Sequence, residues 1–228
     1  MNNIYDTLLQ IPVFQGLSKE RFEEIIGNTR FDFLKYPAGE QLAWENDEYT
    51  NIKFIISGSI RTELNNSSRK IKIIETLPAP NVLVPNRLFG KATFFPLSVF
   101  AEEDTGIMQL DKQIFIELMQ AEKIVLLNFI NNISYRSQKG AEAFTNISSS
   151  NIKARFAFWI LYFSSPKSRD IKIISKQKDL YSWFGVQRSI FINMLDEMKQ
   201  EEILDYSVRE INIINRNKLN SYYTKLLW

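Results

Sequence analysis

The stretch Ser175–Tyr206, SKQKDLYSWFGVQRSIFINMLDEMKQEEILDY, decides the fold of this chain. It predicts a short helix, a turn at Gly185 and a second helix over about Gln187–Gln200, because glycine supplies the positive φ that a tight turn needs. Two further runs, 203–206 and 210–214, predict a hairpin. Helix, glycine turn, helix and hairpin in this order are typical of a winged helix-turn-helix. The expected buried side chains are Leu180, Trp183 and Phe184 in the first helix and Phe191, Met194, Leu195 and Met198 in the second, the latter at i, i+3, i+4, i+7 spacing.

The second helix of such a unit enters the major groove of DNA, where its N-terminal side chains reach base edges. Residues 150–190 carry eight Lys or Arg against two Asp, which indicates an anionic partner. A solvated helical face would give the same count, and charge alone does not separate these two interpretations. The predicted base-reading residues are Gln187, Arg188, Ser189 and Asn193, and the predicted DNA-backbone contacts are Lys176, Lys178 and Arg209.

The composition excludes many kinds of active site. The 228 residues include no Cys and no His, which removes disulfides, thiolate nucleophiles, the usual zinc and haem ligands and the base of a serine triad. We therefore expect a binding protein rather than an enzyme, with no catalytic residue, metal or cofactor. No apolar run reaches the roughly 20 residues that span a bilayer. Because Met1–Gln10 also lacks a basic n-region, we expect a cytoplasmic protein without a membrane partner.

Short strands dominate residues 1–110. The polar loop Asn65–Ser68 separates Arg61–Leu64 from Lys70–Ile74, which is a hairpin signature. A short helix with Ser18 as its N-cap precedes these strands. Many short strands at spacings of about 8–12 residues indicate a β-sandwich or barrel.

After Leu110 the apolar spacing becomes helical, and a long helix is expected over about Ala121–Ser148. About 28 residues span about 42 Å, which is longer than a small barrel can cover. We therefore expect this helix to pair with its copy in a second subunit, and a helix capping the chain's own barrel is the alternative. Ser148–Asn151 is the expected linker to a helix over Ile152–Phe163. The seam has near coiled-coil spacing and contains Leu126, Ile130, Ile133, Ser137, Ala141 and Phe144.

Three groups of motifs, in order over nearly the whole chain, resemble the bacterial catabolite-activator/fumarate-nitrate regulator (Crp/Fnr) family of transcription factors. The resemblance implies an α+β fold with a cyclic-nucleotide-binding-like β-barrel (jelly roll) over 1–120, a dimerisation helix over 121–148 and a winged helix over 149–228. It also implies double-stranded DNA, a second copy of the chain and RNA polymerase as partners, and it leaves room for an unidentified small-molecule effector. The motifs are Tyr36–Glu40 and Ile52–Ile60, then Phe95–Thr105, then Lys178–Leu180, Gly185–Ser189, Asn193–Leu195 and Ile203–Leu204.

The recognition helix departs from the family pattern. That pattern is Ser-Arg-Glu-Thr with an Arg four residues after the Glu, and only Arg188 matches it. Arg188 can fork onto guanine O6 and N7 while Asn193 suits adenine, so the resemblance implies an operator unlike the usual half-site. Ile190 replaces a Thr that would touch phosphate, so we expect one backbone contact fewer.

The expected sensor domain lacks the family's cyclic-AMP signature. Leu77–Phe89 has no Gly-Glu for the ribose, and Phe95 stands near the place of the phosphate-binding Arg. Gly140 and Ala141, at the adenine positions, have no side-chain donor. A phosphate buried without a cation is costly to desolvate, so we expect independence from cyclic AMP. The candidate effector-pocket residues are Arg87, Phe89, Phe95 and Phe129, although a filled core is the better interpretation of the aromatic side chains.

Three other functions stay open on the sequence. A cyclic-nucleotide-responsive regulator would need Arg87 to take over the phosphate contact. A small-molecule-binding module would use the hairpin domain for protein contacts instead of DNA. A jelly-roll enzyme would need an all-carboxylate metal site, and the sequence offers no such cluster.

Overall fold

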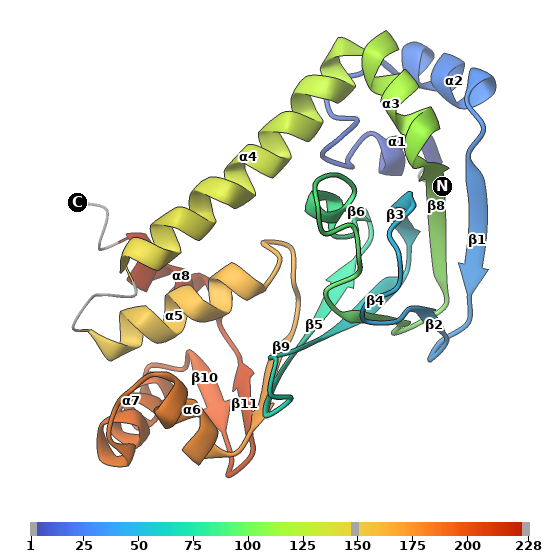
Figure 1. Cartoon of the computed structure of the whole chain (residues 1–228). Helices are drawn as coiled ribbons and strands as arrows, with labels where there is room; N and C mark the ends of the chain where they lie inside the picture. The colour runs from blue at the N-terminus through green and yellow to red at the C-terminus, as the bar shows by residue number, and fades with distance from the viewer. Residues whose placement is uncertain (1–3, 147–150, 225–228) are drawn as a thin grey trace. The chain divides into compact units, whose positions relative to one another are not determined.

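The computed structural model describes residues 4–146 and 151–224 (Figure 1). The chain divides into two compact units. The first consists of Met1–Arg61 and Leu77–Ser137, and the second consists of Thr62–Thr76 and Gln138–Trp228. The domain boundaries predicted near residues 120 and 149 stay predictions. The second compact unit also includes Thr62–Thr76, a segment from the first half of the chain.

Two antiparallel sheets form the centre of the first unit. One has the strand order β1-β8-β3-β6, and in the other β4, β7 and β2 are neighbours. The strands are β1 (Asp32–Tyr36), β2 (Gln41–Ala43), β3 (Asn51–Ser57), β4 (Ser59–Asn65), β6 (Asn81–Val82), β7 (Ser98–Ala101) and β8 (Thr105–Asp111). The jelly-roll architecture is confirmed, but the described strands form two open sheets rather than a closed barrel. The edge strands β2 and β6 have only three and two residues, too few to close a barrel by hydrogen bonding.

Helices cover one end of the first unit. Ser18 caps α2 as predicted, because its hydroxyl accepts the Arg21 N–H at 3.2 Å. Phe14, in the loop before α2, joins helix to sheet, since its ring lies 5.0 Å from Phe22 and 5.1 Å from Phe54. The helical segments are α1 (Ile4–Leu8), α2 (Lys19–Asn28), η1 (Pro85–Arg87), α3 (Lys112–Ala121) and α4 (Lys123–Asn146).

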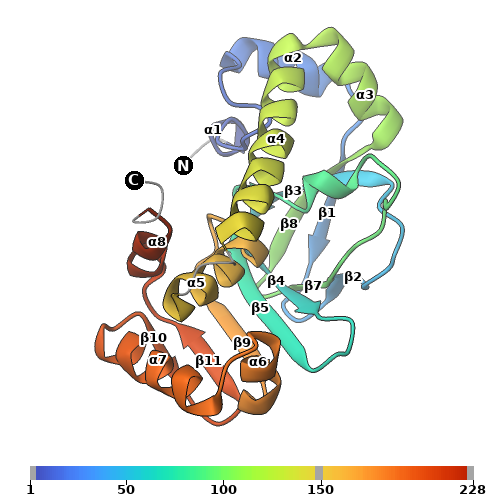
Figure 2. The same ribbon diagram turned by 60° about the vertical axis from the view of Figure 1, so that its left-hand side comes forward.

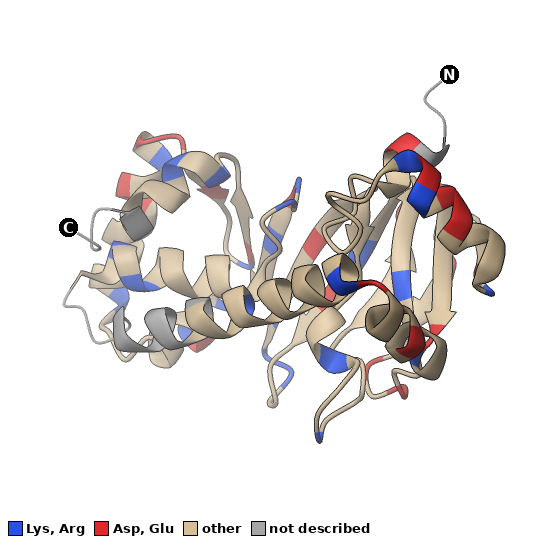
Figure 3. Cartoon of the chain, turned by 90° about the horizontal axis from the view of Figure 1, so that it is seen from above, with Lys and Arg blue, Asp and Glu red and all other residues tan. Residues whose placement is uncertain are grey.

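The long helix α4 confirms the prediction of one extended helix after the strands. Ala121 belongs to α3, and Ser148 lies outside the described residues. Between Lys123 and Arg136 the helix carries no charged residue, so this part of it is tan in Figure 3. The division between the two units falls inside α4, after Ser137.

In the described part of the second unit after residue 150, four helices pack around one sheet (Figure 2). Its strands follow the order β10-β11-β9-β5, with the Thr62–Asn65 part of β4 next to β5. The core gathers Phe156 from α5, Phe191 from α7 and Ile73 from β5, each at most 5% exposed. The elements are β5 (Ile71–Pro78), α5 (Ile152–Phe163), β9 (Ile171–Ser175), α6 (Gln177–Trp183), α7 (Arg188–Gln200), β10 (Leu204–Tyr206), β11 (Glu210–Ile213) and α8 (Arg216–Thr224).

The hairpin β4–β5 is confirmed as a hairpin, but the sequence did not anticipate its partner. Strand β5 pairs antiparallel with β9 over five residues, from Ile71 opposite Ser175 to Glu75 opposite Ile171. The ladder therefore joins a strand of the first half of the chain to the sheet that carries the wing.

Candidate nucleic-acid interface

The helix-turn-helix consists of α6, Gly185 and α7. Gly185 has φ +63°, and a Cβ added there would meet nothing within 4 Å, so the backbone conformation alone favours glycine. The Phe184 carbonyl, one residue before the turn, accepts a hydrogen bond from Arg155 at 2.6 Å. The turn is thereby tied to α5.

The buried stripe of α7 is confirmed, since Phe191, Met194, Leu195 and Met198 are all at most 2% exposed. The prediction for Trp183 is wrong, because its side chain is 56% exposed. The predictions for Leu180 and Phe184 are confirmed, and the ring of Phe184, just beyond the end of α6, is stacked 5.9 Å from that of Phe191.

The four predicted base-reading side chains lie on the exposed surface of the first two turns of α7. Arg188 is the first residue of the helix, and Gln187 is its N-cap without a side-chain capping bond. Ser189 in the same first turn and Asn193 in the second turn are also exposed. Ile190, between them, is 47% exposed. Together these side chains expose a guanidinium that can donate two hydrogen bonds, two amides, a hydroxyl and one apolar side chain.

The acidic side chains near the C-terminal end of α7 form ion pairs and hydrogen bonds within the second unit. Lys153 on α5 contacts Glu197 and Glu201 at 2.7 and 2.8 Å. The Tyr206 hydroxyl donates to Asp196 at 2.5 Å, and this hydrogen bond raises the pKa of Tyr206 to about 12. These contacts tie the C-terminal half of α7 to α5 and the wing.

The wing turn lies beside the start of α6. Ser175 N–H donates to the Arg209 carbonyl at 3.0 Å, and Gln177 Nε2 donates to the Ser207 carbonyl at 3.3 Å. The structure thus brings together the three cations predicted to contact the DNA backbone. They line one cavity of about 600 Å³, the basic cavity, whose walls are Asn65, Arg69, Lys70, Lys72, Ile174, Ser175, Lys176, Lys178, Asp179 and Arg209.

The candidate effector residues sit among packed side chains of the first unit. The rings of Phe89 and Phe129 lie 5.7 Å apart, and Phe95 packs on Tyr49 at 4.8 Å. Phe95 and Phe129 are at most 3% exposed, and Arg87 is half-buried at the end of η1. These are the contacts of a filled core, and a role as an effector pocket stays a prediction.

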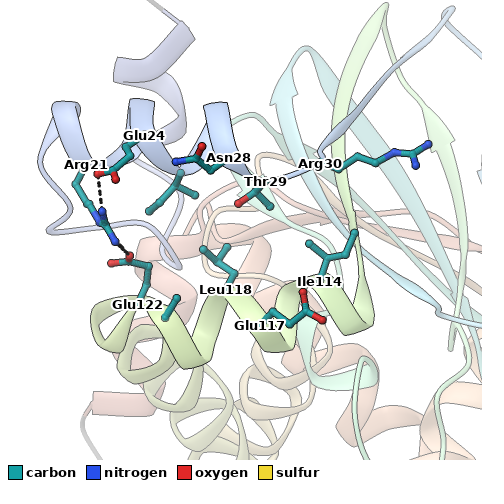
Figure 4. A pocket seen from close by; sticks show the side chains of 11 residues that line it. Arg21, Glu24, Asn28, Thr29, Arg30, Ile114, Glu117, Leu118 and Glu122 are labelled. Carbon is teal, nitrogen blue, oxygen red and sulfur yellow. Dashed lines mark hydrogen bonds and ion pairs between the residues drawn. The ribbon is translucent and has the colours of Figure 1, made fainter.

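A separate cavity of about 430 Å³ in the first unit lies between α2 and α3 (Figure 4). Arg21 donates to Glu24 at 2.5 Å and also to Glu122, and the hydrogen bond to Glu122 is the main cause of the raised pKa of the guanidinium. Two Arg and three Glu line this cavity, so its charges compensate one another, and none of the predicted effector residues is among its walls.

Residues 33–122 match the family model of the cyclic nucleotide-binding domain. The match covers β1 to α3, and it confirms the resemblance found in the sequence for this part of the chain. Comparison with curated protein sequences gives no significant match.

Solved structures show that nearly the whole chain matches the fold of the Crp/Fnr regulators. The catabolite activator protein of Thermus thermophilus has 16% identity and a TM-score of 0.51, covering 94% of this chain and 99% of that one. A protein of Eubacterium rectale described as a Crp/Fnr-family transcriptional regulator has 17% identity and a TM-score of 0.50, covering 93% and 98%. A CooA variant from Carboxydothermus hydrogenoformans has 17% identity and a TM-score of 0.50, covering 97% and 96%.

The described residues contain neither a cluster of metal ligands nor a membrane-spanning helix. Over 4–146 and 151–224, no three Asp or Glu side chains gather in a way that could hold a metal ion. No helix in the described part of the chain has both the length and the hydropathy for a membrane crossing.

Sequence reasoning missed Arg69 and Lys70 as candidate functional residues. They lie in the loop of the β4–β5 hairpin and line the basic cavity. A polar loop between two strands looks like any solvent-exposed turn, so only the pairing of β5 with β9 makes these two cations part of the candidate interface.

Proposed function

We propose that this chain is a homodimeric, sequence-specific DNA-binding transcription regulator of the Crp/Fnr type, which acts in the bacterial cytoplasm without cyclic AMP and has no enzymatic activity. RNA polymerase, and a small-molecule effector where one exists, complete the expected partners. The observation that carries the proposal is the exposed N-terminal face of α7, on a winged helix whose wing turn and α6 start carry cations.

The side chains on α7 supply the chemistry of base recognition. The Arg188 guanidinium can donate two hydrogen bonds to guanine O6 and N7, and the Asn193 amide can do the same with adenine N6 and N7. The exposed Ile190 suits contact with a thymine methyl group. Lys176, Lys178 and Arg209 bind backbone phosphates, which fix the register without reading sequence.

The function is tested by selecting genomic fragments that the purified full-length protein retains, sequencing them and confirming the shared site by gel shift. We expect one enriched, two-fold symmetric sequence whose half-sites lie about one helical turn apart. Retention of fragments without any shared sequence would contradict the proposal.

Independence from cyclic AMP rests on the chemistry of the first unit. The segment that would hold the ribose and phosphate contains the buried Leu83 and Leu88 in place of a Gly-Glu turn. Phe95, near the place of the phosphate-binding Arg, is 2% exposed. An apolar environment of this kind disfavours a phosphodiester anion.

Calorimetric titration of the full-length protein with cyclic AMP should therefore give no heat of binding at micromolar concentrations. Micromolar or tighter binding would overturn this part of the proposal. In that case Arg87→Ala identifies the phosphate partner, because it would abolish the binding if Arg87 makes the contact.

Replacing Lys178 with alanine should weaken binding to all duplexes alike, because a phosphate contact carries no sequence information. The slope of log K against log salt should fall by about one unit for each phosphate that the variant no longer neutralises, and therefore by about two units in a dimer. The measurement is a salt titration by fluorescence anisotropy on specific and scrambled duplexes. Lys91→Ala is the control, because Lys91 is an exposed lysine of the first unit. A weakening confined to the specific duplex would assign Lys178 to base recognition instead.

A further inference from the structure

The β4–β5 hairpin is fixed to the winged helix by more than its ladder with β9. Ile71 and Ile73 are at most 5% exposed and belong to the same core as the buried stripe of α7. The Glu75 carboxylate accepts the Ser165 N–H at 2.8 Å. Thr76 exchanges backbone hydrogen bonds with the segment before β9, at 3.0 and 3.1 Å. The hairpin therefore forms part of the DNA-binding unit as a rigid element.

Its loop reaches the end of the sheet where the wing turn and α6 lie. The last ladder pair of β5 and β9 is Ile71 and Ser175, so their chain neighbours Lys70 and Lys176 lie at the same end of the sheet. On the other side of β9, Glu210 pairs with Ile174, which puts Arg209 at the same end. Figures 1 and 2 show β5, β9 and β11 side by side, with α6 following β9.

The loop is also held in one conformation. The Asn66 side-chain oxygen accepts the N–H groups of Lys70 and Ile71 at 2.9 and 3.1 Å, and its amide donates to Ser68 at 3.0 Å. Arg69 has φ +53°, a left-handed conformation that favours glycine. An arginine therefore stands at a backbone position where glycine would be less strained.

The basic cavity is lined by cations from the hairpin loop, the start of α6 and the wing turn. Six of its walls are Lys or Arg, and Asp179 is its one carboxylate. Lys72 is paired with Glu63 at 2.6 Å. A concave surface lined by charges of one sign concentrates an attractive potential for anions. The remaining five cations are all exposed.

We propose that the hairpin loop is a further DNA contact of this chain, in which Arg69 and Lys70 bind backbone phosphates of the duplex beside the half-site that α7 reads. This inference rests on the proposed DNA-binding function. A polymer can cross an open, exposed surface, whereas a small-molecule site buries most of its ligand. The phosphate groups of DNA are therefore the occupant that this geometry fits.

The test uses full-length protein in which Arg69→Gly and Lys70→Ala are combined. The first substitution suits the left-handed backbone at Arg69, so the melting temperature should not fall. Arg169→Ala is the matched control, because Arg169 is an exposed cation at the opposite end of β9. Two duplexes carry the same operator, and one extends about ten base pairs beyond it on each side.

We expect the salt slope on the long duplex to fall by about two units per subunit in the double variant and to stay unchanged in the control. The short duplex, which lacks the flanking phosphates, should show a much smaller difference. A wild-type slope on the long duplex, with the Arg188→Ala variant having lost its sequence preference, would overturn the hairpin contact alone. A wild-type protein without sequence preference would instead overturn the proposed function.

Calorimetry with inorganic pyrophosphate tests whether the basic cavity binds a small phosphorylated ligand instead of DNA. Binding to wild type that the double variant loses, together with unchanged salt slopes, would assign the basic cavity to a small phosphorylated ligand and overturn the proposal. No pyrophosphate binding, together with the lowered slope, supports the DNA contact.

Discussion

Replacing Arg188 with alanine should remove most of the sequence preference of this protein. A bidentate contact between arginine and guanine discriminates against the wrong base by about 1–3 kcal/mol. A symmetric dimer makes the contact twice, so the specific complex should lose about 2–6 kcal/mol. Binding to a scrambled duplex should change far less. The measurement is anisotropy on both duplexes at the same salt concentration, because affinities at different salt cannot be compared.

Lys199→Ala is the control for this experiment. Lys199 lies near the C-terminal end of the same helix and pairs with Asp205 at 2.6 Å, away from the predicted base-reading surface. Its removal takes away the same charge from the same helix and should leave sequence preference intact. If Arg188→Ala weakens specific and scrambled binding equally, Arg188 is a phosphate contact and the assignment of the groove-facing surface is wrong.

The recognition helix could be predicted from sequence because its signals are local. The spacing of Phe191, Met194, Leu195 and Met198 defines one buried face, and Gly185 marks the turn. The prediction for Trp183 fails and that for Phe184 is confirmed, because positions three and four residues after Leu180 both lie near its helical face and spacing does not show which of them is buried.

The partner of β5 could not be predicted in this way. Its residues alternate between buried and half-buried, which shows that one face of the strand is covered. The pattern does not show what covers it, because strand pairing joins residues about 100 positions apart in the chain. The basic cavity follows from that pairing, so Arg69 and Lys70 could not be linked to Lys176 from sequence.

Ile130→Asp should convert the protein to a monomer. Helix α4 has 24 residues, about 36 Å, and no charge between Lys123 and Arg136. Its predicted seam includes Ile130, whose side chain is 48% exposed in the single chain, while Leu126 and Ile133 are half-buried and Ser137 is exposed. The side chains of Ala141 and Phe144 lie outside the described residues.

Because Ile130 is half exposed in the protomer, an aspartate there should leave the fold intact. In a dimer seam the same carboxylate would be buried twice without a partner, at a cost of several kcal/mol. Light scattering should then give the mass of one chain, about 26.7 kDa, for the variant and twice that for wild type. Asn131→Asp, an exposed neighbour with the same added charge, should stay dimeric. Since half-site recognition needs two recognition helices on one duplex, the monomeric variant should also lose most of its operator affinity. An unchanged dimer mass for Ile130→Asp would place the subunit interface elsewhere.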